Sequence, residues 1–209
     1  MKILIIIPAY NEELNIERVV DNLIRNYPQY DYIVVNDGSK DSTAEICRQK
    51  GYQLIDLPIN LGLSGAVQTG IRYAIKNGYD AAVQFDGDGQ HRPEYIKALA
   101  DKIINENAQV VIGSRFVTEK KTHSLRMLGS CILSSMIRLS TGKKIQDPTS
   151  GMRMFGKEVL YEFAYDMNYG PEPDTISYLI KQGKKVEEIQ VTMDERIAGE
   201  SYLNLVRSI

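Results

Sequence analysis

Residues 3–13 read ILIIIPAYNEE, a continuous apolar run that is stopped by Pro8 and followed by polar residues. An apolar run without alternation is typical of a strand that is buried on both faces, as in a parallel sheet. Apolar residues then recur at helical spacing over residues 14–27, at Ile16, Val19, Val20 and Leu23. A buried strand followed directly by an amphipathic helix predicts an α/β fold.

The same alternation continues to residue 115. We expect further strands at residues 32–35, 52–57, 81–85 and 110–113, and helices at residues 41–47, 65–76 and 93–104. Parallel strands need crossover connections, which are right-handed and place helices over the sheet. The sequence therefore predicts a mostly parallel central sheet with helices on both faces.

The alternation becomes irregular after residue 115. Residues 118–122 are polar and basic, and we expect a loop there. The remaining expected elements are a helix at 125–139, a strand at 152–155, helices at 157–163 and 174–181, and a strand at 185–191. A chain of 209 residues has the size of one domain, so residues 1–209 are taken together.

Composition excludes several classes of protein. The chain is 43% hydrophobic and 25% charged, as soluble globular proteins are. Its 25 basic and 27 acidic residues give a net charge of −2, so no nucleic-acid partner is expected. Cys47 and Cys131 are too few for a disulfide framework, and no apolar run approaches the roughly 20 residues that span a membrane. We expect a cytoplasmic chain in a reducing compartment.

Polar residues follow each expected strand of the first half. The loops concerned are residues 8–13, 36–39, 60–65, 86–91 and 114–115. Ligands of open parallel sheets bind beyond the carboxyl ends of the strands. We therefore expect these five loops to build one site.

The pair Asp86 and Asp88 is the strongest local indication of a metal site. Two carboxylates two residues apart, in a glycine-rich turn at a strand end, can reach one hard cation from the same side. Mg²⁺ or Mn²⁺ prefers oxygen ligands and shares them with substrate phosphates, and Gln90 could add a neutral oxygen. The alternative is a solvated Asp-Gly turn. His91 is expected to be a loop residue rather than a ligand or a base.

Two other loops have more than one interpretation. Asp37 could accept hydrogen bonds from a nucleobase or a ribose, or it could cap the turn at residues 39–43. Gly62 and Gly65 lie at a helix start, where backbone N–H groups could approach a ligand closely. The loop is neither a Walker loop nor a G-x-G-x-x-G turn after the first strand, which argues against an ATPase or a dehydrogenase.

Taken jointly, the motifs resemble family-two glycosyltransferases of GT-A fold. The first set is PAYNEE at 8–13, VNDGSKD at 35–41, NLG at 60–62 and DGDGQH at 86–91. GSR at 113–115, DPTSGMR at 147–153 and RIAGES at 196–201 narrow the resemblance to the dolichyl- and polyprenyl-phosphate sugar transferases. The resemblance runs in order along nearly the whole chain.

The resemblance implies a nucleotide-binding half at residues 1–115 and an acceptor-binding half at residues 116–209. The implied donor contacts are Pro8, Tyr10, Glu12, Asp37, Gly62, Gly65, Asp86 and Arg153. The implied ligands of Mg²⁺ or Mn²⁺ are Asp86, Asp88 and Gln90. The acceptor phosphate would be held by Arg115, Arg126, Ser130 and Arg196, and the implied catalytic set is Asp88, Asp147, Arg115 and Arg196.

The activity that this implies is inverting transfer of a sugar from a nucleotide-sugar donor, with UDP favoured, to polyprenyl phosphate. Transfer to a sugar hydroxyl in cell-wall or capsule assembly is an alternative, and it needs a general base, for which Asp147, Glu172 and Asp174 are available. An alternative of another class is a nucleotide-binding regulatory module without turnover.

The helix expected at residues 125–139 has two interpretations. It could be an ordinary core helix, or it could lie on a membrane surface with Lys120 and Lys121 beside anionic headgroups. A lipid-linked acceptor implies peripheral attachment at the cytoplasmic face. We expect this attachment to be helped by a separate membrane-anchoring protein or by C-terminal helices that are absent from this sequence.

Overall fold

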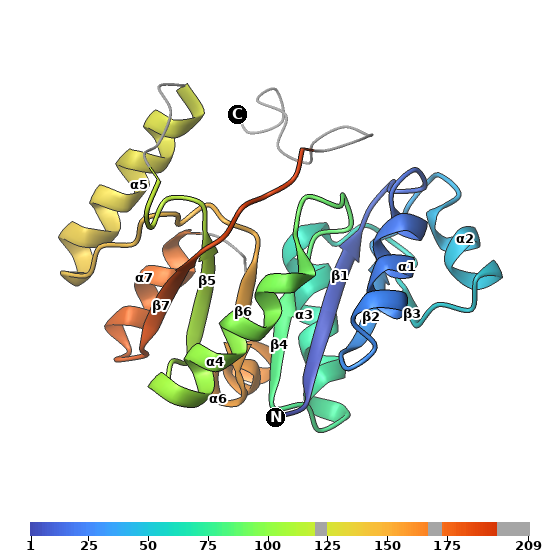
Figure 1. Cartoon of the computed structure of the whole chain (residues 1–209), viewed down its shortest axis with the longest axis horizontal. Helices are drawn as coiled ribbons and strands as arrows, with labels where there is room; N and C mark the ends of the chain where they lie inside the picture. The colour runs from blue at the N-terminus through green and yellow to red at the C-terminus, as the bar shows by residue number, and fades with distance from the viewer. Residues whose placement is uncertain (120–124, 167–172, 196–209) are drawn as a thin grey trace.

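The computed structural model describes residues 1–119, 125–166 and 173–195. Within these ranges, seven strands form one sheet in the order β3-β2-β1-β4-β6-β5-β7 (Figure 1). β6 is antiparallel to both of its neighbours, and the other strand pairs are parallel. The strands are β1 Ile3–Ala9, β2 Asp31–Asn36, β3 Leu54–Asp56, β4 Ala81–Gln84, β5 Val110–Ser114, β6 Arg153–Gly156 and β7 Val186–Gln190.

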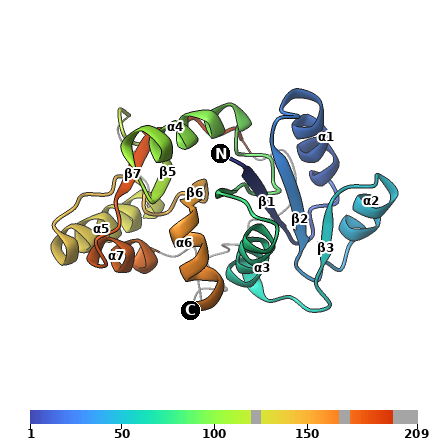
Figure 2. The same ribbon diagram turned by 90° about the horizontal axis from the view of Figure 1, so that it is seen from below.

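Helices cover both faces of this sheet. They are α1 Ile16–Asn26, α2 Thr43–Gln49, α3 Gly62–Lys76, α4 Ile96–Glu106, α5 Leu125–Thr141, α6 Lys157–Tyr161 and α7 Pro173–Lys181. Figure 2 shows α1 and α4 on one side of the sheet and α3 and α6 on the other. α5 lies beyond these layers and contacts α7.

The alternation of side chains along β1 produces two separate cores. Leu4 and Ile6 pack in a cluster with residues of α3, α6 and α7. Ile3, Ile5 and Ile7 pack in a second cluster with residues of α1, α2 and α4. Because successive side chains of a strand point to opposite faces, a central strand covered on both sides must be apolar throughout. This is the physical reason for the continuous run at the start of the sequence.

The predicted fold class is confirmed, and the expected elements are present with shifted ends. The strand expected at 52–57 is limited to Leu54–Asp56, and the helix expected at 93–104 begins as a 3-10 turn, Pro93–Tyr95, before α4. The helix expected at 157–163 is α6 followed by a π-helical turn, Glu162–Asp166. The loop expected at 118–122 is described only to residue 119.

The strand directions bring the expected polar loops to one edge of the sheet. The strands other than β6 run the same way, so their carboxyl ends lie together, at the upper edge in Figure 1. β6 runs the opposite way and therefore starts at this edge. Its reversal adds the loop that precedes Arg153 to the loops after β1, β2, β4 and β5.

Candidate active site

The turn after β4, residues 86–91, is called the acidic turn below. Asp86 Oδ1 accepts a hydrogen bond from Gln84 Nε2 at 3.1 Å, and the Asp86 N–H donates to His91 Nδ1 at 2.9 Å. The Gln90 N–H donates to Asp88 Oδ1 at 3.0 Å. These contacts hold both carboxylates in a defined turn at the sheet edge.

His91 has a larger role than the sequence predicted. The ring is buried, packs edge-on against Phe85 and accepts the Asp86 N–H. Since Nδ1 accepts this bond, the ring proton is on Nε2, which lies 3.6 Å from Asp86 Oδ2. His91 is thus a support of Asp86, and the sequence signal for it was its position at the end of the acidic turn.

The donor chemistry of the acidic turn fits a hard divalent cation. Asp86, Asp88 and Gln90 supply carboxylate and amide oxygens, the ligands that Mg²⁺ and Mn²⁺ prefer. Within the described ranges, no group of three or more His, Cys, Asp or Glu side chains could hold a metal ion. Mg²⁺ usually takes its remaining ligands from substrate phosphates and water.

Gly151, from the loop before β6, lies directly against Asp86. A Cβ at Gly151 would lie 2.6 Å from Asp86 Oδ2 and 3.4 Å from His91 Cε1. On the other side of the turn, a Cβ at Gly87 would lie 3.1 Å from the Pro8 carbonyl oxygen. The two glycines let the loops after β1 and before β6 approach the acidic turn closely.

The loops after β1, β2 and β3 are tied together on the other side of the site. Asp37 is buried, and its Oδ1 accepts the Leu61 N–H at 2.7 Å. Gly38 has φ +65°, and a Cβ there would lie 2.7 Å from the Asn60 nitrogen. Glu12 is buried as well, and its Oε2 accepts a hydrogen bond from Asn15 Nδ2 at 2.7 Å. Both carboxylates therefore fix loops in this region.

The remaining predicted donor residues lie at the same edge. Pro8 is buried at the end of β1, and Tyr10 is half-buried just after it. Gly62, with φ +77°, is the first residue of α3. A Cβ at Gly65 would lie 2.4 Å from Leu61 Cβ, so the first turn of α3 packs tightly on the preceding loop.

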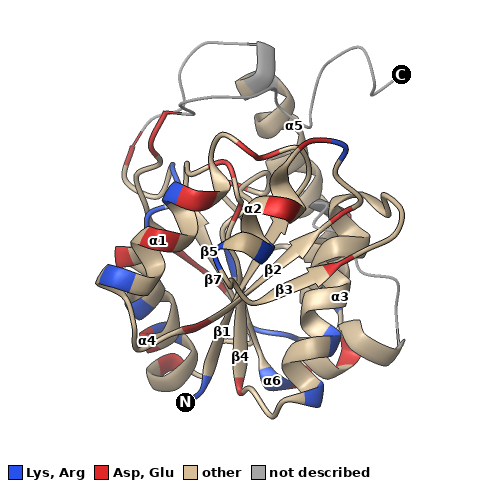
Figure 3. Cartoon of the chain, turned by 90° about the vertical axis from the view of Figure 1, so that its right-hand side faces the viewer, with Lys and Arg blue, Asp and Glu red and all other residues tan. Residues whose placement is uncertain are grey.

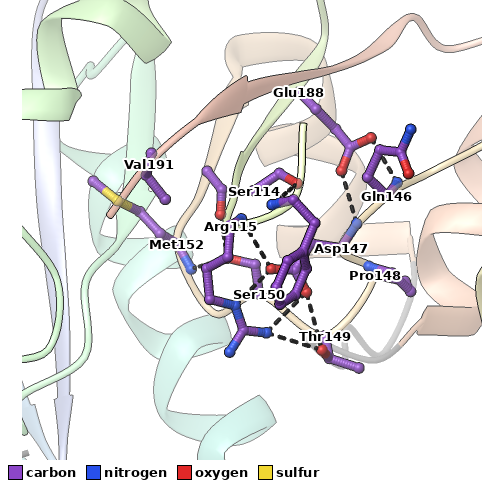
Figure 4. Close-up of polar contacts among 12 residues, drawn as sticks. Ser114, Arg115, Gln146, Asp147, Pro148, Thr149, Ser150, Met152, Glu188 and Val191 are labelled. Atoms are coloured by element: carbon purple, nitrogen blue, oxygen red, sulfur yellow. Dashed lines mark hydrogen bonds and ion pairs between the residues drawn. The ribbon is translucent and has the colours of Figure 1, made fainter. Parts of the chain in front are cut away.

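Arg115 and Asp147 form the best-defined pair of the site (Figure 4). Arg115 Nε donates to Asp147 Oδ2 at 2.7 Å, and Nη2 donates to Oδ1 at 2.9 Å. The Arg115 backbone N–H and the Thr149 hydroxyl also donate to the carboxylate, each at 3.1 Å. The Asp147 side chain is 0% exposed, whereas that of Arg115 is 26% exposed. A buried carboxylate thus anchors an arginine that still reaches solvent.

The electrostatics of Asp147 follow from this geometry. Burial alone raises the pKa of the carboxyl, but hydrogen bonds from Arg115 and its positive charge outweigh it, so the pKa of Asp147 lies below its ordinary value. Asp147 is ionised at neutral pH, and both of its oxygens are engaged. This arrangement makes it a poor general base.

The loop that carries Asp147 is held from several directions. Glu188 on β7 accepts the Asp147 and Gln146 N–H groups through its two carboxylate oxygens (Figure 4). Arg153 is buried, and it donates to the backbone oxygens of Ser150 and Pro148 at 2.9 and 2.8 Å. Arg153 was expected near the donor sugar from its motif, and the contacts that the structure gives it are to this loop. Glu188 was missed, because a glutamate in a strand pattern carries no distinguishing sequence signal.

Some predicted residues cannot be compared with the geometry. Arg196, Lys120, Lys121 and Glu172 lie outside the described residues, as does the side chain of Arg126. Ser130 is described, and it is buried on α5. Among the helices in the described part of the chain, none has the length and apolar character needed to cross a bilayer.

Comparison with known proteins agrees with the motifs. The family model for glycosyl transferase family 2 matches residues 4–163. The chain is 36% identical over 178 residues to the UDP-N-acetylglucosamine–dolichyl-phosphate N-acetylglucosaminyltransferase of Methanococcus voltae, covering 76% of this chain and 70% of the relative. It is 30% identical over 216 residues to the undecaprenyl-phosphate mannosyltransferase of Micrococcus luteus, covering 98% of this chain and 88% of the relative.

A solved structure supports the fold independently. Glucosyl-3-phosphoglycerate synthase from Mycobacterium tuberculosis, in complex with Mn²⁺, UDP and glucosyl-3-phosphoglycerate, matches with a TM-score of 0.67 and 20% identity. The match covers 95% of this chain and 73% of that chain. With the family model spanning residues 4–163, this chain belongs to glycosyl transferase family 2 and is a glycosyltransferase.

Proposed function

We propose that this glycosyltransferase moves a sugar, with inversion, from a nucleotide-sugar donor to polyprenyl phosphate at a membrane surface. The observation that carries the proposal is the anchored Arg115. Its Nε and Nη2 are fixed on Asp147, and its Nη1 makes no hydrogen bond to a described residue. An arginine that is held by a buried carboxylate and whose side chain is still 26% exposed is suited to bind an anionic acceptor.

The chemistry of the acceptor agrees with the arrangement around Asp147. A phosphate monoester is already anionic at neutral pH, so it attacks a sugar carbon without a strong general base. What it needs is a positive group that aligns it opposite the leaving group. Transfer to a sugar hydroxyl would need a base, and Asp147, which is paired and ionised, is a weak candidate for that role. The anchored pair therefore favours phosphate over a hydroxyl as the acceptor.

The donor would bind at the opposite side of the site. Departure of the nucleoside diphosphate leaves negative charge, which a bound Mg²⁺ or Mn²⁺ neutralises. Asp86, Asp88 and Gln90 would hold this cation, and Gln84 and His91 would keep Asp86 in place. The Mycobacterium tuberculosis enzyme of the same fold was solved with Mn²⁺ and UDP, which supports the cation and our preference for a UDP-sugar.

Relatives support the lipid acceptor. The Methanococcus voltae and Micrococcus luteus proteins are named for transfer to dolichyl phosphate and to undecaprenyl phosphate. α5 adds a physical reason: Ile132 is 53% exposed, Met136 60% and Leu139 88%. Spaced at i, i+4 and i+7, these three side chains form one apolar stripe along the helix. We infer that this stripe rests on the cytoplasmic leaflet in which the lipid acceptor is anchored.

The direct test is a transfer assay with the purified protein and Mn²⁺. Radiolabelled UDP-glucose, UDP-N-acetylglucosamine and GDP-mannose are offered in turn with undecaprenyl phosphate in detergent. The matched acceptor is undecaprenol, which has the same lipid but no phosphate, and Asp88→Asn serves as the inactive control. We expect labelled lipid from at least one donor with the phosphate only. Equal use of undecaprenol, or no labelled lipid from any of the three donors, would overturn the proposal.

A further inference from the structure

The segment after β7, residues 191–195, crosses from the acceptor half to the acidic turn (Figure 1). The Val191 N–H donates to the backbone carbonyl oxygen of Ser114 at 2.9 Å, and the Thr192 N–H donates to the Tyr95 hydroxyl at 3.1 Å. The Asp194 N–H donates to the backbone carbonyl oxygen of Gln90 at 2.9 Å. The segment is thus tied first to the end of β5, then to the turn before α4, and finally to the acidic turn.

Asp194 makes more of these contacts than any other residue described for the segment. Its Oδ1 accepts hydrogen bonds from Arg92 Nε at 2.8 Å and from Arg92 Nη2 at 2.5 Å. Its backbone oxygen accepts a hydrogen bond from Gln90 Nε2 at 3.3 Å. These contacts of Asp194 with Gln90 and Arg92 are called the Asp194 bridge below. The bridge joins Asp194 to both the backbone and the side chain of Gln90 in the acidic turn.

The Asp194 bridge fixes which way the Gln90 side chain is turned. A carboxamide has one donor end and one acceptor end, and a backbone carbonyl only accepts. The amide nitrogen of Gln90 must therefore face Asp194, and its oxygen is directed away from Asp194. Gln90 is the residue whose amide oxygen completes the oxygen set of Asp86 and Asp88.

We propose that Arg92 and Asp194 are positioning residues that orient Gln90 for the cation. This rests on the proposed function, because it takes the acidic turn as the cation site. Neither residue is an expected ligand of the cation, and both act through Gln90.

The experiment measures binding of Mn²⁺ in the presence of UDP by electron paramagnetic resonance, with UDP binding alone measured by calorimetry. The variants are Arg92→Asp, Asp194→Arg, the swap that combines them, and Gln90→Ala. Arg92→Asp is the decisive one, because an added negative charge near the turn would strengthen cation binding, whereas loss of positioning weakens it. Lys97→Ala is the matched control, since it removes an exposed ion pair with Asp101 on α4.

We expect Arg92→Asp to weaken Mn²⁺–UDP binding about 10-fold and the swap to return to within about 3-fold of the wild type. Metal-free UDP binding, the thermal midpoint and the Lys97→Ala variant should stay unchanged. In a Gln90→Ala background, Arg92→Asp should cause no further loss, as expected when two residues act through one contact. The proposal would be overturned if Arg92→Asp bound Mn²⁺ as tightly as the wild type or more tightly. It would also be overturned if the swap variant bound Mn²⁺ no more tightly than the single variants.

The binding experiment uses no acceptor, so the positioning role of Arg92 and Asp194 and the proposed function fail separately. Loss of cation binding in Arg92→Asp with no glycolipid formed by the wild type would leave the Asp194 bridge standing and overturn the proposed function.

Discussion

Two helices of this enzyme differ in the side chains that they bury and expose. α1 in the first half buries Ile16, Val19, Val20 and Leu23, and its outer face carries charged residues such as the paired Asp21 and Arg25 (Figure 3). α5 in the second half buries Ser130 and Ser134 together with Ile137. Its exposed residues include Ile132, Met136 and Leu139.

The two burial patterns indicate different surroundings for the two helices. The pattern of α1 matches a helix that has water on one side and a protein core on the other. The pattern of α5 leaves an apolar stripe outside, which suits a helix with a second apolar environment on its outer side. This contrast agrees with our proposal that the first half binds the donor and that α5 contacts the lipid surface.

The largest expected effect tests the donor half. Asp88→Asn removes one carboxylate of the acidic turn, and metal stabilisation of the leaving group is worth several kcal/mol, so transfer should fall by at least about a thousand-fold. Initial rates with saturating Mn²⁺ measure this, and circular dichroism checks the fold. Asp101→Asn on α4 is the control and should retain activity. Full wild-type activity in excess EDTA would contradict the metal role of this half.

The contrast between the two halves also explains what the sequence could predict. The strands and helices of the first half follow regular periodicity, so their order and approximate ends could be predicted from residues such as Ile3–Ile7 alone. The reversed direction of β6 could not, because its apolar residues satisfy a parallel or an antiparallel neighbour equally well. The exposure of Ile132, Met136 and Leu139 on α5 could not be predicted either, since periodicity identifies an apolar face without saying whether protein covers it.

The candidate site was predictable where a motif combined residue type with position at a strand end. Asp86 and Asp88 meet that condition, and so does Asp37. Long-range partners do not: Glu188 supports Asp147 from β7, and Asp194 reaches Gln90 across 104 residues of sequence. Such contacts depend on the register of the completed sheet, which no local pattern of the sequence records.

The second prediction compares the ion pairs of the two halves. Arg115→Ala leaves the buried Asp147 without its partner, and the free energy of unfolding should fall by about 3–5 kcal/mol. Arg25→Ala breaks the exposed pair with Asp21 on α1 and should cost less than about 1 kcal/mol. Urea denaturation at pH 7 measures both. Equal losses would show that the Arg115–Asp147 pair is not buried as described.

The third prediction concerns pH. The pKa of Asp147 is lowered in the folded protein, so its stabilisation is fully present above the unfolded value of about 4 and is lost as pH falls through the lower folded value. Between pH 7 and pH 3, wild-type stability should therefore decline more than that of Asp147→Asn, which cannot titrate at this position. Urea midpoints across this range test it, and parallel curves would contradict the role of Asp147.

The fourth prediction tests the apolar stripe of α5. Ile132→Asp or Met136→Asp should lower binding to anionic liposomes about 10-fold, because burying a half-exposed aliphatic side chain is worth roughly 1–1.5 kcal/mol. Co-sedimentation measures binding, and thermal midpoints should not change. Ile24→Asp on α1, also an exposed apolar position, is the matched control and should bind as the wild type does. An equal loss in Ile24→Asp would remove the distinction between the two helices.

The smallest effect compares one thiol from each half. Cys47 on α2 is buried, and burial raises the pKa of its thiol to about 11, whereas Cys131 on α5 is exposed. Because the thiolate is the nucleophile, only about one Cys47 side chain in a thousand is reactive at pH 8. A disulfide reagent should therefore titrate one thiol quickly in the folded protein and the second only in denaturant. Cys131→Ser should abolish the fast phase, and anionic liposomes should slow it in the wild type if α5 lies on the bilayer. A fast phase that persists in Cys131→Ser would mean that the core around α2 opens more readily than the outer face of α5.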